Sequence, residues 1–170
     1  YTLNICGKLS LQIIPILYLI IFENFFLNEI GNYDYFALGL GSFSIPFSLL
    51  SVLFLINAFN YFDGLDGVLG FTSITIIAIL YFLIPDKDIK LFFIIISIPI
   101  CIFLFFNFSI FRLPKLFLGD NGSLLLGFIF AFILIYLSNQ KLIHPILLAW
   151  SISIFVYEFL SINLIRIINK

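Results

Sequence analysis

The strongest constraint on the fold is a succession of six long apolar runs separated by short polar stretches. A helix needs about 20 apolar residues to cross the hydrocarbon core of a bilayer, and somewhat fewer when flanking side chains reach the interface. The runs therefore predict an all-α, polytopic integral membrane protein with about six transmembrane helices. We place these helices near residues 9–27, 41–57, 70–85, 91–108, 122–138 and 145–167.

Composition supports a membrane protein and argues against a nucleic-acid-binding protein. Hydrophobic residues make up 63% of the 170 and charged residues 10%, whereas soluble domains have roughly 45–50% and 25%. Eight Lys and Arg against nine Asp and Glu give a net charge of -1, so no basic surface exists to bind nucleic acid. With no repeat and no long linker, residues 1–170 are expected to form a single transmembrane domain.

The first four residues and the two cysteines give no sign of a signal peptide or of a redox or metal site. The first residues, Tyr1 to Asn4, include neither an initiator Met nor the basic region of a signal peptide. The chain is therefore expected to begin within a longer protein. Cys6 and Cys101 lie in or beside apolar runs, where a thiol behaves as a small hydrophobic group rather than a redox or zinc site.

The positive charges predict an orientation. With six crossings and an inside N-terminus, five cations fall inside and three fall outside, which agrees with the positive-inside rule. The inside group is Lys8, Arg112, Lys115, Arg166 and Lys170, and the outside group is Lys87, Lys90 and Lys141. The loops that carry the aspartates discussed next are then cytoplasmic.

The first polar stretch follows the second apolar run. Polar side chains recur there at every third position: Asn57, Asn60, Asp63 and Asp66. Groups at this spacing drift around an ideal helix and share one face only if the helix tightens or ends. Gly64 and Gly67 are suited to ending it. We expect a helix end whose carboxylates and amides meet in a water-accessible pocket, with a solvated turn as the plain alternative.

The second polar stretch leads from Pro114 into the fifth apolar run. Pro114 prevents the preceding helix from continuing. Ser123 or Asn121 is expected to cap the next helix, whose free N–H groups would favour a phosphate.

The same stretch contains a candidate metal ligand. Gly119 and Gly122 would allow close approach of a ligand to the backbone, and Asp120 lies between them. One or two carboxylates with phosphate oxygens and waters are the usual ligands of Mg²⁺. A capped interfacial turn is the plain alternative.

Together the two stretches resemble the polyprenyl-phosphate N-acetylhexosamine-1-phosphate transferase family, which includes bacterial enzymes that make undecaprenyl-linked GlcNAc and the phospho-MurNAc-pentapeptide translocase. Residues 57–67 are similar to the family signature N-A-x-N-x-x-D-G-x-D-G, and residues 117–123 are similar to F-M-G-D-x-G-S. The resemblance runs the length of the chain. It implies a larger all-helical enzyme, truncated here at both ends, because the family's paired-aspartate motif would precede residues 8–14 and its histidine-rich loop would follow residues 164–170. We therefore expect the chain to be inactive in isolation.

The resemblance also implies roles for residues. Asp120 would bind Mg²⁺, with Mn²⁺ as an alternative, and Phe117 would stack on the uracil ring. The implied catalytic residues are Asp63, Asp66 and Asp120. The implied substrate-binding residues are Asn57, Asn60, Lys115, Phe117, Gly119 and Ser123.

The implied reaction transfers a sugar-1-phosphate from a UDP-sugar to polyprenyl phosphate, releasing UMP, as the first membrane step of cell-envelope polysaccharide synthesis such as lipopolysaccharide. The site would be cytoplasmic, in the plasma (inner) membrane of a bacterium, and a homodimer is compatible with the resemblance. Residues 113–115 shift the proline of the family's P-A-K, and Leu118 replaces its Met. Glu158 resembles the translocase branch, while residues 144–146 and the spacing from Asn107 to Phe117 resemble the GlcNAc branch, which we favour.

Other residues have structural interpretations. His144, the single histidine, is expected to be a turn residue, and Trp150 an interfacial anchor. The acidic residues Glu23, Glu29 and Asp34 are expected to form a solvated outer face. Glu158 lies within the last apolar run, where helix packing and function are equally supported.

Two other functional classes were considered. An ion-coupled transporter would use the three aspartates to line an ion path, but such sites lie near the midplane and these residues fall at one face. A non-catalytic membrane scaffold is the second alternative, disfavoured by the intact aspartate motifs.

Overall fold

The computed structural model describes residues 5–33, 36–64, 66–109 and 114–169, and in these ranges the chain is almost entirely helical. The long elements are apolar helices, as predicted. Their bounds are α1 Ile5–Ile21, α2 Ser44–Phe62, α3 Val68–Leu83, α4 Lys87–Asn107, α5 Gly119–Asn139, α6 Pro145–Ser151 and α7 Ser153–Ile168. A 3₁₀ turn, Gly41–Phe43, precedes α2.

The described helices fit a polytopic membrane protein. Three segments are long and apolar enough to cross a membrane: Gly41–Phe62, Lys87–Asn107 and Gly119–Asn139. The pair α6 and α7 makes a fourth if its 57° bend lies within one span. Two further apolar helices are shorter, with 17 residues in α1 and 16 in α3. The all-α prediction is confirmed, with fewer full-length spans than the six expected.

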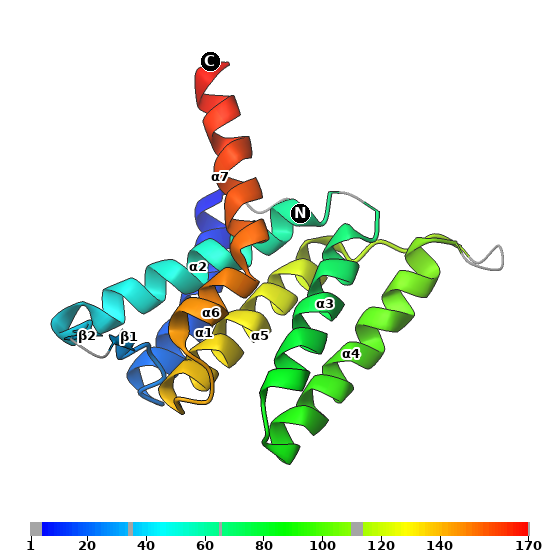
Figure 1. Ribbon diagram of the computed structural model, residues 1–170. Coiled ribbons are helices and arrows are strands. Elements are labelled where there is room, and N and C mark those ends of the chain that lie inside the picture. The colour runs from blue at the N-terminus through cyan, green and yellow to red at the C-terminus, as the bar shows by residue number, and fades with distance from the viewer. Residues whose placement is uncertain (1–4, 34–35, 65, 110–113, 170) are drawn as a thin grey trace.

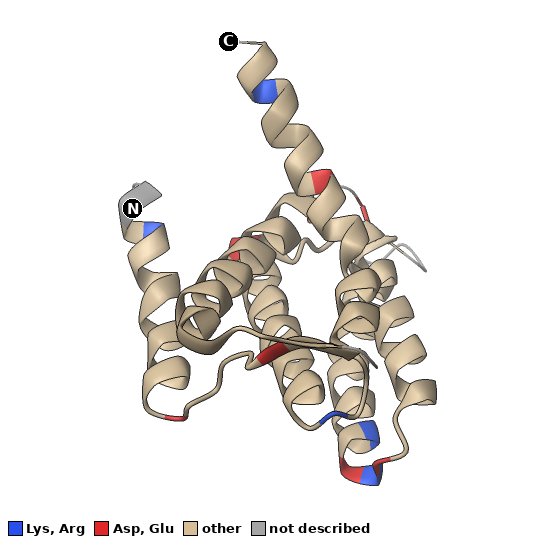
Figure 2. Ribbon diagram, turned by 60° about the vertical axis from the view of Figure 1, so that its left-hand side comes forward, with Lys and Arg blue, Asp and Glu red and all other residues tan. Residues whose placement is uncertain are grey.

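Successive helices run back and forth, so charged residues gather toward two ends of the bundle (Figure 2). The pairing of Lys8 with Asp120 joins the start of α1 to the start of α5. At the opposite end, the Asn28 backbone N–H donates to the Asn139 side chain, which joins the chain after α1 to the end of α5. These two contacts show that α1 and α5 run in the same direction.

The centre of the bundle is the contact of α2 with α5 (Figure 1). Phe59 of α2 is fully buried, and its ring lies 5.1 Å from Phe130 of α5 and 4.0 Å from Phe155 of α7. Gly127 allows α5 to approach closely, because a Cβ there would lie 2.7 Å from the Ile56 Cα. Small residues at a helix interface let two backbones come together in this way.

Besides the ends of α1 and α2, which lie at Ile21 and Phe62 instead of near residues 27 and 57, four differences from the sequence predictions stand out. The run 145–167 is broken at Ile152, and α7 extends beyond the rest of the bundle (Figure 1). The expected loop 85–90 is partly helical, because Asp86 caps α4 by accepting hydrogen bonds from the Asp88 and Ile89 N–H groups. The expected loop after α1 contains an antiparallel hairpin, β1 Glu29–Tyr33 and β2 Phe36–Gly39. The start of α5 is the fourth difference.

The position of Gly127 generates a stability prediction. We expect Gly127→Ala to lower the free energy of unfolding by about 1–3 kcal/mol, because overpacking a tight interface forces backbone shifts. Thermal unfolding of the detergent-solubilised protein measures the effect. Gly39→Ala is the matched control, since a Cβ there meets nothing within 4 Å. Equal melting temperatures for the two variants would contradict the proposed tight contact.

Candidate functional site

The site begins where α2 ends. Asp63 follows the last helical residue, and Gly67 takes a left-handed conformation with φ of +70° before α3 begins. A Cβ on Gly67 would lie 2.1 Å from the Phe108 ring, so both conformation and space require glycine. The expected helix end is present, but α2 ends at Phe62 before either glycine, and Gly67 lies at the start of α3. Leu65 of the signature lies outside the described residues.

The second stretch enters the site earlier than predicted. The helix α5 begins at Gly119, with φ of +68°, and not near residue 122. The expected cap by Ser123 or Asn121 is wrong, because no side chain caps this helix. The Ser123 hydroxyl instead bonds the Gly119 and Asp120 carbonyls at 3.1 and 3.2 Å, as serine does inside a helix. Asp120 therefore lies in the first turn, where the helix dipole favours a carboxylate.

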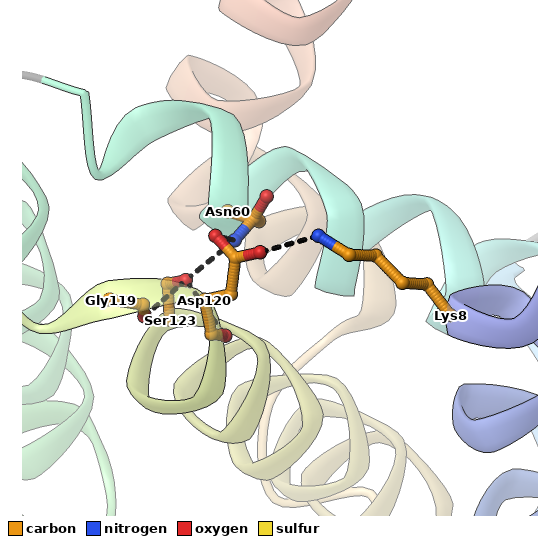
Figure 3. A network of polar contacts seen from close by, with 5 residues as sticks. All are labelled: Lys8, Asn60, Gly119, Asp120 and Ser123. Atoms are coloured by element: carbon orange, nitrogen blue, oxygen red, sulfur yellow. Dashed lines mark hydrogen bonds and ion pairs between the residues drawn. The ribbon is translucent and has the colours of Figure 1, made fainter. Parts of the chain in front are cut away.

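Asp120 is the centre of a polar network from three helices (Figure 3). Lys8 of α1 contacts one carboxylate oxygen at 2.7 Å. The Asn60 amide of α2 lies 3.4 Å from the other oxygen and donates to the Ser123 hydroxyl at 2.9 Å. Residues far apart in the sequence thus meet at one end of the bundle.

A second ion pair lies in the same part of the site. Lys115 pairs with Asp66, and its ammonium lies 5.1 Å from the centre of the Phe117 ring. Phe117 is 67% exposed, which is a large exposure for an aromatic ring. The ring is thereby available to stack on a planar ligand beside a cation. Arg112 and Leu113, from the same stretch of sequence, lie outside the described residues.

Asp63 connects the two signatures electrostatically. Burial raises the pKa of the half-buried Asp63 carboxyl, the N–H of Gly119 opposes that rise by hydrogen bonding, and the Asp120 charge adds to it. The Asp63 carboxyl is therefore close enough to Asp120 for the two negative charges to disfavour each other. Two like charges held close together are a natural place for a cation.

One predicted substrate-binding residue lies apart from the others. The Asn57 amide donates to the Gln12 side chain of α1 at 3.0 Å and to the Leu53 carbonyl at 2.7 Å. It lies one helical turn away from Asn60, deeper along α2. In this structure Asn57 joins two helices, and it does not contact the Asp120 network.

Sequence reasoning missed Lys8 as a site residue. It is close to the start of the first apolar run, and positive charge at that place was interpreted as an orientation signal alone. The contact of Arg166 with Tyr61 was missed as well. Arg166 donates to the Tyr61 hydroxyl at 2.8 Å, which attaches the projecting helix α7 beside Asn60. Pairs so distant in sequence leave no local signal.

Below the network an apolar groove runs between α1 and α5. It has a volume of about 400 Å³. Its polar mouth is formed by Lys8, Asp120 and Asn121, and its walls include Leu11, Pro15, Leu124, Leu125 and Phe128. A ligand with a charged head and an apolar tail matches this arrangement.

The donor set at this end is compatible with Mg²⁺. Within the described ranges there is no group of three or more His, Cys, Asp or Glu side chains placed to hold a metal ion. Mg²⁺ usually takes one or two protein carboxylates and completes its shell with waters and phosphate oxygens. Asp120 and the nearby Asp63 supply that number.

His144, Glu29 and Glu158 do not contribute to the Asp120 network. His144 caps α6 at the opposite end, where its ring packs against Tyr33 with 5.4 Å between ring centres. Glu29 lies in β1, and Glu158 lies half-buried in α7. Asp34 lies outside the described residues.

The pKa of Asp63 generates a pH prediction. Because burial raises its pKa above the ordinary 3.8, the folded protein binds this proton more tightly than the unfolded chain. Stability is therefore lost as pH rises from 3.8 through the raised pKa. We expect Asp63→Asn to melt at a higher temperature than wild type at pH 7, with the gap narrowing toward about pH 4. A gap of equal size at both pH values would contradict this cause.

A family model described as Glycosyl transferase family 4 matches residues 1–138. No curated protein and no solved structure matches the chain. The matched residues include both aspartate stretches, Lys8 and all of α5 except its last residue. Since the match covers well over half of the 170 residues, this chain belongs to glycosyl transferase family 4 and is a membrane-embedded sugar-phosphate transferase.

Proposed function

We propose that this protein transfers GlcNAc-1-phosphate from a UDP-sugar to a polyprenyl phosphate, releases UMP, and thereby begins the synthesis of a cell-envelope polysaccharide. The observation that carries the proposal is the meeting of Asp63, Asp66 and Asp120 with two lysines at one end of the bundle. A diphosphate donor and a phosphate acceptor both carry negative charge. They require cations beside the carboxylates that would otherwise repel them.

The chemistry of the transfer sets what the site must do. An oxygen of the lipid phosphate attacks the sugar-linked phosphorus of the donor in line. A new phosphorus–oxygen bond forms, the bond from that phosphorus to the bridging oxygen breaks, and UMP leaves. Protein groups then have two tasks, which are to align two anions and to stabilise the charge that develops.

The described residues divide these tasks. Lys8 and Lys115 offer the positive charge, and Phe117 offers an exposed ring for the uracil. The Asn60 amide donates to both Asp120 and Ser123 and so fixes the position of these side chains relative to α2. A lipid phosphate carries nearly two negative charges at neutral pH, so its attack does not require a protein base.

Asp120, with Asp63 beside it, is proposed to hold Mg²⁺ or Mn²⁺. The ion, when bound, neutralises the donor diphosphate and makes UMP a better leaving group. Gly119 contributes through its backbone, because its left-handed conformation directs its N–H toward the Asp63 carboxylate.

We also propose that the site faces the cytoplasm at the plasma membrane of a bacterium, because nucleotide-activated donors are found there. The described cations do not decide the orientation. Lys8, Lys115 and Arg166 lie at the site end, while Lys87, Lys90 and Lys141 lie at the other. Arg112 and Lys170, which gave the site end its excess in the sequence, lie outside the described residues.

The location of the aspartates argues against a transporter. Asp63 follows α2, and Asp120 lies in the first turn of α5, so both lie at helix ends. An ion-coupled site would be expected near the midplane, commonly at broken helices. The broken pair in this chain, α6 and α7, breaks at Ile152, where no titratable side chain is present.

The first test is Mg²⁺-dependent release of UMP by the full-length protein with polyprenyl phosphate and UDP-GlcNAc. We expect Asp120→Asn to lower the rate by about 100-fold or more, as for other groups that stabilise developing charge. Asp88→Asn, a carboxylate at the opposite end of the bundle, is the control and should keep the wild-type rate.

The outcomes separate the donors. Activity with UDP-MurNAc-pentapeptide but not with UDP-GlcNAc would replace the proposed donor and leave the reaction class intact. Release of UMP with neither donor would overturn the proposed reaction.

Phe117 generates a second activity prediction. Stacking of a base on an aromatic ring contributes about 1–3 kcal/mol. We therefore expect Phe117→Leu to raise KM for the UDP-sugar by about 5- to 150-fold with a smaller change in kcat. Phe117→Tyr retains the ring and should stay close to wild type. An unchanged KM in Phe117→Leu would remove uracil stacking from the proposed role of this residue.

A further inference from the structure

Lys8 forms an exposed ion pair with Asp120. Its ammonium contacts the Asp120 carboxylate at 2.7 Å, and both side chains are about half exposed, at 51% and 59%. An exposed ion pair of this kind is held by less than about 1 kcal/mol. The contact is therefore easily exchanged for another of similar strength.

Lys8 differs in this respect from the other lysine of the site. Lys115 has two partners, the Asp66 carboxylate and the face of the Phe117 ring. Within the described part of the chain, Asp120 is the side chain to which Lys8 donates. If Asp120 turns to a divalent cation, Lys8 is left as an unpaired positive charge beside that cation, and the two repel each other.

The surroundings of Lys8 indicate what would take the place of Asp120. Lys8 stands at the mouth of the groove between α1 and α5, whose walls are apolar below the Asp120 network. Leu125 in that wall is 57% exposed. A phosphate at the mouth would meet the Lys8 ammonium, and an apolar chain attached to that phosphate would cover the groove.

We propose that Lys8 is an exchangeable counter-ion, which pairs with Asp120 when no divalent cation is bound and turns to the phosphate of the acceptor lipid, seated in the α1–α5 groove, when Asp120 binds the cation. This inference rests on the proposed function. The cation would free Lys8 for the lipid phosphate, and the phosphate would free Asp120 for the cation. Each ligand therefore strengthens the binding of the other. Two of the three carboxylates, Asp120 and Asp66, each have a lysine partner that offsets their charge.

The test measures two affinities in the full-length protein in detergent. Mn²⁺ binding without substrates is followed by electron paramagnetic resonance, and binding of farnesyl phosphate at saturating Mn²⁺ is followed by calorimetry. In Lys8→Gln we expect Mn²⁺ to bind about two- to five-fold more tightly, because its competitor is gone. We expect farnesyl phosphate to bind about ten-fold more weakly, because a charged hydrogen bond is lost.

Changes of opposite sign are the signature of exchange. A lysine that merely supports the fold would lower both affinities when replaced, and that result would overturn the proposal, as would the absence of any change. Lys8→Arg keeps the charge and should retain both affinities. Lys90→Gln removes a lysine at the opposite end, where it lies over the Tyr81 ring, and should leave both affinities unchanged.

Two further arms separate the sources of the signal. Inorganic phosphate lacks the apolar chain, so we expect it to bind much more weakly than farnesyl phosphate, and equal binding would overturn the role of the groove. UMP release is measured independently. If the opposite changes in affinity are found but no UMP is released, the proposed reaction fails and the exchange stands. If UMP is released but both affinities fall in Lys8→Gln, the exchange alone fails.

Discussion

The close contact between α2 and α5 is the constraint on which the site depends. Gly127 lets α5 approach until a Cβ at that position would lie 2.7 Å from the Ile56 backbone. Asn60 lies four residues beyond Ile56, and Ser123 lies four residues before Gly127, so the same contact continues upward into the Asn60–Ser123 hydrogen bond. A wider separation of the helices would break this bond and remove Asn60 from Asp120. Packing in the apolar interior thereby sets the geometry of the polar end.

The polar end joins groups whose charges compensate each other. Asp120 and Asp66 each pair with a lysine. Burial raises the pKa of Asp63, and hydrogen bonding by the Gly119 N–H opposes that rise. Exposed lysine–carboxylate pairs of this kind are weakly held, which is why we propose that the lysines and carboxylates change partners when anions and a cation bind. The groove beside Lys8 extends this polar site into the apolar surface of the bundle, where a lipid substrate would be dissolved. This placement suits the soluble donor and the lipid acceptor that we propose.

Much of the fold follows from local sequence. The apolar runs predicted the helices, because lipid-length segments with few charges have few alternatives. The polar stretch after α2 contains a turn, as predicted, but α2 already ends at Phe62, and Gly67 in its left-handed conformation begins α3 instead. The boundaries of α4 and α5 were missed, because Asp86 caps one helix and Asp120 enters the other in polar sequence that resembles a loop. The bend at Ile152 has no proline or glycine to signal it.

The sequence by itself determined the class of protein, the two aspartate stretches and their order along the chain. Local composition and spacing are sufficient for these, because helix formation in lipid and turn formation at glycine are local events. The tertiary structure alone decided that Lys8 pairs with Asp120, that Asn57 donates to Gln12, and that Arg166 attaches α7 to Tyr61. These pairs join residues 112, 45 and 105 positions apart. Their contacts depend on how whole helices pack, which no short stretch of sequence encodes.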